Sequence, residues 1–309
     1  MIGLGWLLGG ASVRAESYFV VEAHSGRVLV AHDAERKRPV ASLTKIGTAI
    51  VVMDWAKITG TDLGLLAMVP SSAGTLGGAN PMGLRPGDRI SLRNALYSAL
   101  MGSDNVAAQT LAHHVGFAML RQRGREGDPV KAFVAEMNVL ARELGMRRTK
   151  FANAHGMDNR GERGQSTAAD MAKLGVYAMR HPGFAFFVKQ KSRSISFYSA
   201  GVERSFVVAN TNRLLGEMGI NGMKTGMTAL AGQCLAASSE RTPIVQKLPD
   251  GRNTMTKRLL ISVVLGSPDR FARTRGIVND GWSRYDQWRA AGSPVQDAAR
   301  ELMVVPNPM

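Results

Sequence analysis

The sequence predicts an α/β fold, an α+β sandwich in which an antiparallel sheet is flanked by helices. First, strand-like runs lie near both ends of the chain, at 18–31 and 195–265, so N- and C-terminal strands can pair in one sheet. Second, helical periodicity in the middle indicates an inserted, mostly helical subdomain at roughly 60–165. Third, a composition of 45% hydrophobic and 20% charged residues over 309 positions is typical of a globular protein with a substantial core.

The chain begins with an apolar segment that is typical of the end of a secretory signal. Residues 1–15 hold a short apolar region and then small residues, with Val13-x-Ala15 as a cleavage signature and no basic region before them. We interpret 1–15 as a truncated signal segment and 16–309 as the folded domain. The protein would then be exported to the periplasm or cell envelope, with its mature start near Glu16. No stretch of the sequence is long and apolar enough for a membrane-spanning helix.

The folded part opens with two strands, at 18–23 and 27–31, joined by a turn at His24-Ser25-Gly26. They predict a hairpin. A helix is expected from Ser42 to about residue 58, because an apolar run follows that serine. The stretch 60–89 is rich in glycine, proline and serine, and it is predicted to be a loop.

Helical periodicity and capping residues predict the helices that follow. Asp128 and Pro129 suit the cap and first residue of a helix that ends before Gly145. Ser166-Thr167 cap the next helix, which His181-Pro182-Gly183 ends. The helices are predicted at 42–58, 91–101, 106–116, 129–144, 167–180 and 271–288.

After residue 194 the pattern changes to strands. The segment 242–256 is polar, contains two prolines and is predicted to be a surface excursion. The simplest arrangement joins the late strands to the N-terminal hairpin in one sheet covered by helices. These strands are predicted at 195–199, 206–209, 223–228, 233–237 and 259–265.

Composition narrows the possible partners. The net charge of +15 suits an anionic partner, but the basic residues are scattered and no nucleic-acid motif accompanies them. We therefore expect a solvated basic surface, with peripheral association with a membrane left open and no nucleic acid bound. The single cysteine, Cys234, excludes an internal disulfide, and the histidines show no ligand spacing, so no metal or other cofactor is predicted.

Ser42 and Lys45 lie three residues apart, so they share one face of the first helix. Serine needs an adjacent base to act as a nucleophile, and lysine can be that base only when burial or a second cation removes its proton. The N-terminus of a helix also favours an anion beside Ser42. Taken alone, however, this pair is better explained as an exposed helix start with an N-cap serine than as a catalytic pair.

Two further motifs change that balance. Ser103-Asp104-Asn105 falls in a loop between two helices, and Lys224-Thr225-Gly226 falls on a strand. Each motif alone is a weak signal. The ordered set of three, with each motif in a fitting element, is a strong signal of the penicillin-binding proteins and class A β-lactamases.

The chain resembles the D-alanyl-D-alanine carboxypeptidases, low-molecular-mass penicillin-binding proteins of serine peptidase family S11, over about 17–288. The resemblance implies a β-lactamase/DD-peptidase-like fold and a serine D-Ala-D-Ala carboxypeptidase. It also implies action on peptidoglycan stem peptides ending in D-Ala-D-Ala, a role in cell-wall maturation, and β-lactams as covalent inhibitors. The chain departs from the family in its long 242–256 segment and in Met227, where a polar residue is expected. The segments that carry the resemblance are Ala41-Ser42-Leu43-Thr44-Lys45, Asn210-Thr211-Asn212-x-Leu214-Leu215, Gly222-Met223-Lys224-Thr225-Gly226-Met227-Thr228, Ala231-Gly232, Phe151-x-Asn153-x-His155-Gly156-Met157 and Ser166-Thr167-Ala168-x-Asp170-Met171.

The resemblance and the chemistry together assign the catalytic roles. Ser42 attacks the D-Ala-D-Ala carbonyl and becomes the acyl-ester, with Lys45 as its base. Ser103 relays a proton between Lys45 and the leaving amine. Lys224 is a second cation that lowers the proton affinity of Lys45 and attracts the terminal carboxylate of the substrate.

The remaining assignments concern substrate binding. The Asn105 amide contacts the substrate backbone or orients Lys45, and the Thr225 hydroxyl contacts the carboxylate. Gly226 lacks a side chain, so a peptide can lie along the strand edge. Backbone N–H groups of Ser42 and Met227 would form the oxyanion hole.

Other polar residues near these motifs receive different roles. His155 is expected to be structural, and Asp104 is expected to cap the helix after it. Arg270 or Arg273 lies either near the carboxylate end of the site or on the surface.

Two alternative functions remain open. A class A β-lactamase shares all three motifs but activates its deacylating water with a Glu-x-x-Asn element, and none of the glutamates between Ser103 and Lys224 has asparagine at that spacing. A penicillin sensor or inactive peptidoglycan-binding relative would need no turnover. The intact pair of Ser42 and Lys45 argues against the inactive form.

Overall fold

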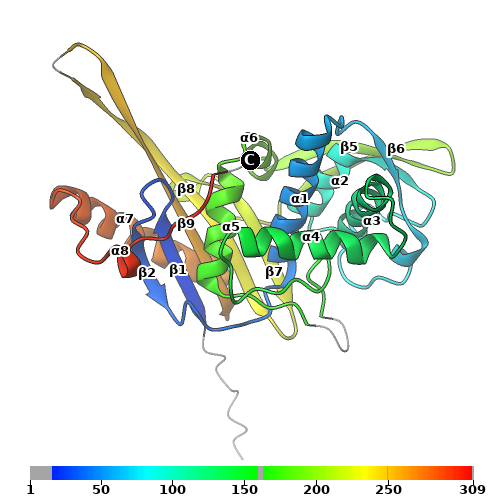
Figure 1. Ribbon diagram of the computed structural model, residues 1–309, viewed down its shortest axis with the longest axis horizontal. Helices are drawn as coiled ribbons and strands as arrows, with labels where there is room; N and C mark the ends of the chain where they lie inside the picture. The colour runs from blue at the N-terminus through cyan, green and yellow to red at the C-terminus, as the bar shows by residue number, and fades with distance from the viewer. Residues whose placement is uncertain (1–15, 159–162, 249, 308–309) are drawn as a thin grey trace, which may run out of the picture.

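Two antiparallel sheets and the helices packed against them make up this chain, seen in a computed structural model that describes residues 16–158, 163–248 and 250–307 (Figure 1). The predicted signal segment, 1–15, lies outside the described residues. The predicted fold class, with antiparallel strands flanked by helices, is confirmed. No described helix is long and apolar enough to cross a bilayer.

The larger sheet joins strands from the two ends of the chain, as predicted. Its strand order is β2-β1-β9-β8-β7, so the first hairpin pairs directly with the last strand, and β7 lies at the edge. An edge strand leaves one row of backbone N–H and C=O groups unpaired within the sheet. The strands are β1 (Ser17–Glu22), β2 (Val28–His32), β7 (Ile220–Thr228), β8 (Gly232–Lys247) and β9 (Asn253–Ser267).

A second sheet of four strands, in the order β3-β4-β5-β6, corrects the prediction of a single sheet. The late strands predicted at 195–199 and 206–209 belong to it, together with two strands from the stretch predicted to be a loop. Those two strands have only three residues each, too few to show a period, and they form through pairing with distant residues. The strands are β3 (Leu66–Met68), β4 (Arg89–Ser91), β5 (Ser192–Ser199) and β6 (Val202–Ala209).

The helices begin largely where capping residues predicted them. Asp104, Asp128 and Thr167 each accept a backbone N–H at the start of a helix. Pro182 opens a short helix where the prediction placed only an end. The helices are α1 (Thr44–Thr59), α2 (Leu92–Met101), α3 (Asn105–Gln122), α4 (Pro129–Glu143), α5 (Ala168–Met179), α6 (Pro182–Val188), α7 (Arg270–Ala290) and α8 (Ala298–Glu301), with 3-10 turns η1 (Ala41–Leu43), η2 (Ser71–Ala73) and η3 (Glu217–Gly219).

Helix α3 continues past Gly116, where the prediction ended it. A Cβ at Gly116 would lie 1.9 Å from the carbonyl oxygen of Pro129. This glycine therefore lets α3 and the start of α4 come close, and it does not mark a helix end.

Helices cover both faces of the larger sheet, with α5 on one face and α7 on the other (Figure 1). The side chains of β1 alternate accordingly: Phe19 and Val21 join the core that contains α1 and α5, whereas Val20 packs with α7 around Trp282. Helix α1 is buried on nearly all sides. The segment that begins with Ser42 is thus anchored in the centre of the molecule.

The 242–256 segment, predicted to be a surface excursion, projects from the surface as a paired ribbon. Strands β8 and β9 continue through it in register, from Ile244 opposite Thr256 to Lys247 opposite Asn253. The two strands leave the sheet and project from the body as a ribbon (Figure 1). We call residues 241–258 the β8–β9 arm.

Candidate active site

The three predicted motifs converge on one cleft of about 490 Å³. Ser42 comes from η1, Ser103 from the connection of α2 to α3, Asn105 from the first residue of α3, and Thr225 from the edge strand β7. Lys45 and Lys224 lie buried beneath the cleft. The lining residues are Ser42, Gly78, Ala79, Ser103, Asn105, Met157, Asp158, Thr211, Thr225, Gly226, Met227, Thr228, Ala229 and Arg270.

Lys45 is held by three oxygen atoms. Its Nζ lies 3.0 Å from Ser42 Oγ, 2.7 Å from Asn105 Oδ1 and 2.8 Å from the backbone oxygen of His155. Asn105 is held in turn, since its Nδ2 donates to the Gly77 carbonyl at 2.9 Å. A neutral amine can donate to Asn105 and His155 and keep its lone pair for the Ser42 hydroxyl.

Ser42 lies in η1, two residues before α1 begins, and its side chain makes no capping hydrogen bond to either helix. The alternative of an exposed N-cap serine is therefore wrong. The side chain of Lys45 is fully buried at the first turn of α1. Ser42 and Lys45 are three residues apart, about one helical turn, so their side chains lie on the same face and come into contact.

Burial changes the proton affinity of both lysines. It lowers the pKa of Lys45 to about 7, against the opposing charge of Asp104. Burial also lowers the pKa of Lys224 well below its usual value, and the charges of Lys45 and Arg270 lower it further. A lysine that is neutral near physiological pH can accept a proton from serine.

The strand side of the cleft is cationic and rich in hydroxyl groups. Thr225 Oγ1 lies 2.6 Å from Thr211 Oγ1, and Lys224 Nζ donates to the Thr225 carbonyl at 3.0 Å. Arg270 donates to the Gly226 carbonyl at 3.0 Å, and its buried Nε has no hydrogen-bond partner among the described residues. These groups suit a carboxylate.

The structure gives Arg270 and Arg273 different locations, which the sequence alone did not distinguish. Arg270 lines the cleft at the start of α7. Arg273, one turn later, forms an ion pair with Glu16 and lies over the ring of Tyr18. Arg273 therefore belongs to the surface.

Ser103 and Met227 line the cleft without forming contacts that define a role. Ser103 has a left-handed backbone, with φ of 62°, and its side chain lines the cleft. It is free to turn toward a bound molecule. The side chain of Met227 is 66% exposed at the rim.

Two neighbouring polar residues have the structural roles predicted for them. Asp104 caps α3 by accepting from Ala107 N at 3.0 Å, and Ser98 Oγ donates to it at 2.9 Å. His155 Nδ1 accepts from Met157 N at 3.2 Å, and burial lowers the pKa of His155 to about 3. This imidazole stays neutral and holds its loop.

Sequence reasoning missed several residues that line the cleft. Thr211 and Asp158 lie in or beside segments that carry the family resemblance, yet their types and spacing indicated no role. Gly78 and Ala79 come from the stretch predicted to be a loop, where no signal pointed to the site. Asp158 is the one carboxylate among the described lining residues.

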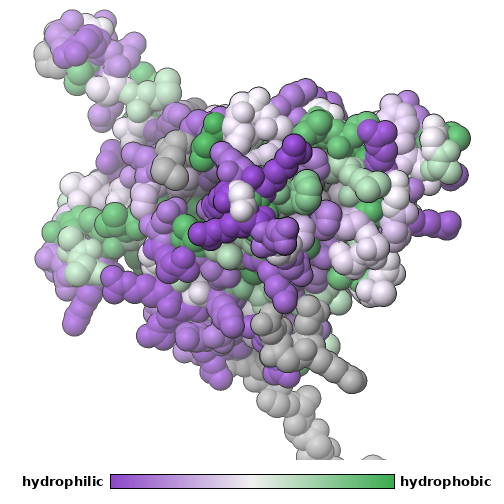
Figure 2. Space-filling view, turned by 45° about the vertical axis from the view of Figure 1, so that its right-hand side comes forward, coloured by the Kyte–Doolittle hydropathy of each residue, from purple (hydrophilic) through white to green (hydrophobic). Residues whose placement is uncertain are grey.

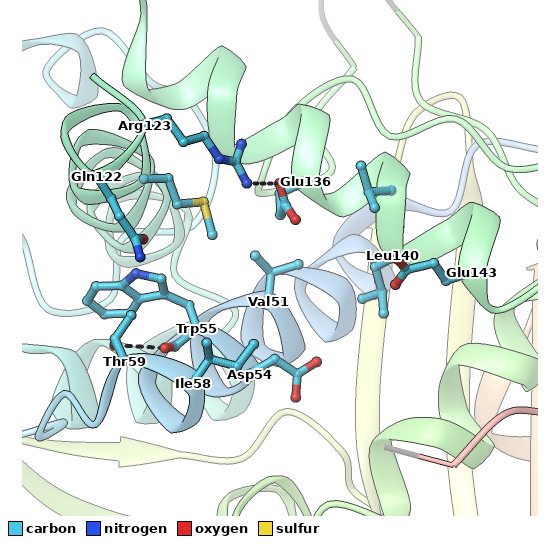
Figure 3. A pocket seen from close by; sticks show the side chains of 12 residues that line it. Val51, Asp54, Trp55, Ile58, Thr59, Gln122, Arg123, Glu136, Leu140 and Glu143 are labelled. Atoms are coloured by element: carbon cyan, nitrogen blue, oxygen red, sulfur yellow. Dashed lines mark hydrogen bonds and ion pairs between the residues drawn. The ribbon is translucent and has the colours of Figure 1, made fainter. Parts of the chain in front are cut away.

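A second hollow, of about 170 Å³, lies between α1, α3 and α4 (Figure 3). Its apolar floor includes Val51 and Trp55, and an ion pair of Arg123 with Glu136 crosses its rim. It contains no member of the three motifs. Within the described ranges, no group of histidine, cysteine and carboxylate side chains could hold a metal ion.

Comparisons with known proteins agree with this geometry. The family profile described as D-alanyl-D-alanine carboxypeptidase matches residues 8–246. D-alanyl-D-alanine carboxypeptidase DacC of Escherichia coli (strain K12) is 32% identical over 263 residues, which cover 83% of this chain and 57% of DacC. DacB2 of Mycobacterium tuberculosis is 32% identical over 228 residues, which cover 74% of this chain and 71% of DacB2. The chain thus spans little more than half of DacC.

Solved structures share the fold. The Streptomyces K15 DD-transpeptidase superposes with a TM-score of 0.72 at 26% identity, covering 86% of this chain and 96% of that one. Penicillin-Binding Protein D2 from Listeria monocytogenes, in its ampicillin-bound form, superposes with a TM-score of 0.68 at 26% identity and the same coverage. The predicted DD-peptidase-like fold is confirmed.

Proposed function

The chain belongs to the D-alanyl-D-alanine carboxypeptidase family, serine peptidase family S11; from that premise we propose that it is a penicillin-binding serine D-Ala-D-Ala carboxypeptidase acting on peptidoglycan stem peptides. The observation that carries the proposal is the set of three contacts at Lys45 Nζ, to Ser42, Asn105 and His155. They hold a buried amine against a serine hydroxyl, as acyl transfer through serine requires.

Acylation begins when Ser42 Oγ attacks the carbonyl carbon of the penultimate D-Ala. The hydroxyl proton moves to the neutral Nζ of Lys45 as the C–O bond forms. Backbone N–H groups of Ser42 and Met227 receive the oxyanion. The C–N bond then breaks, and the proton passes from Lys45 through Ser103 to the amine of the leaving D-Ala.

Water completes the reaction by hydrolysing the ester of Ser42. Lys45 again takes a proton, now from water, and returns it to Ser42 Oγ as the ester bond breaks. This step releases the shortened stem peptide, which has a new carboxylate, and regenerates the hydroxyl group of Ser42.

The strand side of the cleft binds the end of the substrate. The terminal carboxylate lies between the Thr225 hydroxyl and Arg270, which line this end of the cleft, and the buried Lys224 lies next to Thr225 and becomes charged beside the carboxylate. The peptide backbone adds to the open edge of β7. Peptidoglycan stem peptides ending in D-Ala-D-Ala have both a terminal carboxylate and a peptide backbone. β-Lactams mimic the D-Ala-D-Ala amide bond that Ser42 attacks.

The decisive experiment is incubation of the protein with a pentapeptide that ends in D-Ala-D-Ala, with products identified by mass. Release of a single D-Ala is expected, and Ser42→Ala should abolish both this release and covalent labelling by a fluorescent penicillin. A protein that releases no D-Ala, or an alanine variant that is still labelled, would contradict the proposal. Transfer to an added amine acceptor would reveal a transpeptidase instead.

A β-lactamase and a penicillin sensor are the alternatives, and product formation separates them. With a chromogenic cephalosporin, the carboxypeptidase should give a burst of about one product per Ser42 and then slow release, since no described glutamate lines the cleft. Rapid continued turnover would indicate a β-lactamase. Covalent labelling without any D-Ala release would indicate a sensor.

We also propose that the enzyme works outside the cytoplasmic membrane, with residues 16–309 as its catalytic domain, because its substrate is found there. N-terminal sequencing of protein from the cell envelope should give a start near Glu16. Recovery from the cytosol with residues 1–15 intact would count against export.

A further inference from the structure

The β8–β9 arm carries an apolar pair on one of its faces. Val245 and Met255 lie directly opposite each other in the ribbon, so their side chains share a face. They are 58% and 64% exposed. Apolar and hydrophilic residues lie side by side toward the end of the arm (Figure 2). Two adjacent exposed apolar side chains on a projecting ribbon form a small apolar patch that is open to a partner surface.

Lysines flank the apolar pair on the same face. Lys247 lies two residues beyond Val245, and Lys257 lies two residues beyond Met255, and a spacing of two keeps side chains on one face of a strand. The ion pairs of the arm's described residues are Arg252 with Asp250 and Arg241 with Asp286, so both lysines keep their charge available.

The other face of the ribbon is different. It carries Gln246 opposite Thr254, and Ile244 opposite Thr256. The arm as a whole holds five basic residues and one acidic residue. It is therefore a cationic ribbon whose exposed apolar side chains, Val245 and Met255, share one face, whereas Ile244 on the other face is half-buried.

We propose that the β8–β9 arm docks on an anionic lipid surface, with Val245 and Met255 entering the headgroup layer and with Lys247 and Lys257 on lipid phosphates. An amphipathic segment with lysines beside an apolar stripe matches the two parts of such a surface, hydrocarbon and phosphate. A soluble polyanion would use only the lysines. A second copy would bring the same positive charge against them, and edge lysines and prolines such as Pro243 disfavour strand pairing.

The position of the arm suits this role. Gly226, at the catalytic cleft, pairs with Cys234 near the start of β8, whereas Lys247 is at the other end of that strand. At about 3.3 Å per residue, the stretch of β8 from Cys234 to Lys247 spans roughly 40 Å. An arm bound to the membrane would hold the cleft well away from the lipid, where a cell-wall polymer can reach it.

Sedimentation with vesicles tests the proposal on the full chain. Vesicles of equimolar phosphatidylglycerol and phosphatidylcholine should bind the protein, and vesicles of phosphatidylcholine alone should not. Each lysine near an anionic surface contributes about fivefold in affinity, so Lys247→Gln with Lys257→Gln should weaken binding by at least about tenfold. Val245→Ser with Met255→Ser should weaken it comparably.

Matched controls isolate the arm and its face. Lys131→Gln with Lys150→Gln removes the same charge from exposed lysines elsewhere and should leave binding within twofold. Gln246→Ala with Thr254→Ala alters the other face and should do the same. All variants should keep the unfolding temperature and the penicillin labelling of the parent, so failure of the proposed enzymatic function remains a separate result.

Three outcomes would overturn the proposal. Vesicle binding could survive loss of both lysines. Binding could occur equally to soluble polyphosphate, with Val245→Ser and Met255→Ser having no effect, which would indicate an anionic polymer as the partner. The arm variants could instead abolish a concentration-dependent dimer, which would indicate a second copy.

Discussion

Gly226 lies against the backbone of the nucleophile, so that a Cβ at this position would lie 3.0 Å from the Ser42 nitrogen. The same Cβ would lie 3.1 Å from Ala41 Cβ and from the Val40 carbonyl oxygen. The third motif therefore needs glycine because strand β7 and the η1 turn come this close. This requirement holds in addition to any room that the substrate needs.

Gly226→Ala should slow acylation by a penicillin by about tenfold, because η1 must move by a few tenths of an ångström to accept the methyl group. The overpacking should also destabilise the fold by about 1–3 kcal/mol. Second-order acylation rates and thermal unfolding measure the two effects. Gly276→Ala is the control, since its Cβ would meet nothing within 4 Å on the exposed side of α7. Equal acylation rates in the two variants would disprove the close contact.

Acylation should rise with pH through about 7. Burial lowers the pKa of Lys45 to about 7, so the base is protonated and inactive below that pH. The unfolded chain keeps a lysine pKa of about 10.4, so between the two values the unfolded state binds one more proton than the folded state. Stability should therefore rise with pH over this window, by about 1.4 kcal/mol per unit for this one lysine.

Denaturant titrations across that window, on wild type and on Lys45→Met, test the second part. In Lys45→Met the slope of the free energy of unfolding against pH should be smaller by about 1.4 kcal/mol per pH unit. Lys131→Met, on the surface, should keep the slope of the wild type. An unchanged slope in Lys45→Met would mean that Lys45 keeps its proton when folded.

Asp104→Asn should move the acidic limb of the acylation profile to lower pH. The Asp104 carboxylate raises the proton affinity of Lys45, and asparagine removes that charge while still capping α3. Loss of the Ser98 hydrogen bond should cost about 1 kcal/mol of stability. Asp128→Asn makes the same change at the exposed cap of α4 and should leave the limb in place. A shift to higher pH in Asp104→Asn would reverse the assigned electrostatics.

The parts of the fold that sequence could predict are those with local signals. Asp128 and Pro129 define a helix start because a cap and a fixed φ act within one turn. Ser42 and Lys45 could be paired because one turn of helix brings them together. The three-residue strands β3 and β4 and the ordered arm lacked such signals, since pairing with distant residues forms them.

The site shows the same division. The motif order indicated Asn105 as a possible partner of Lys45, but only the fold shows that its amide lies between Lys45 and the Gly77 carbonyl. Arg270 and Arg273 are equivalent in the sequence, one turn apart on α7. The direction in which α7 begins decides which of them faces the cleft, and no local pattern encodes that direction.

The two buried lysines should respond differently to arginine. Lys45 must give up its proton to act as a base, and arginine cannot do so in proteins. Burial lowers the pKa of Lys224 well below its usual value, but a substrate carboxylate beside it would favour its charged form. Arginine at 224 keeps that charge permanently, and a fixed cation there also favours the neutral form of Lys45.

Lys45→Arg should therefore lose acylation almost completely, whereas Lys224→Arg should keep part of it, with the loss concentrated in recognition of the carboxylate. The measurement is the second-order acylation rate of each variant with one penicillin, compared with the same penicillin esterified at its carboxylate. Esterification should strongly reduce the acylation rate of the wild type. It should have no measurable effect on Lys45→Arg, because the acylation rate of that variant is already close to zero. If Lys45→Arg is acylated as fast as Lys224→Arg, or faster, then Lys45 is not the base. The contacts of its Nζ with Ser42 and Asn105 would then only position the nucleophile.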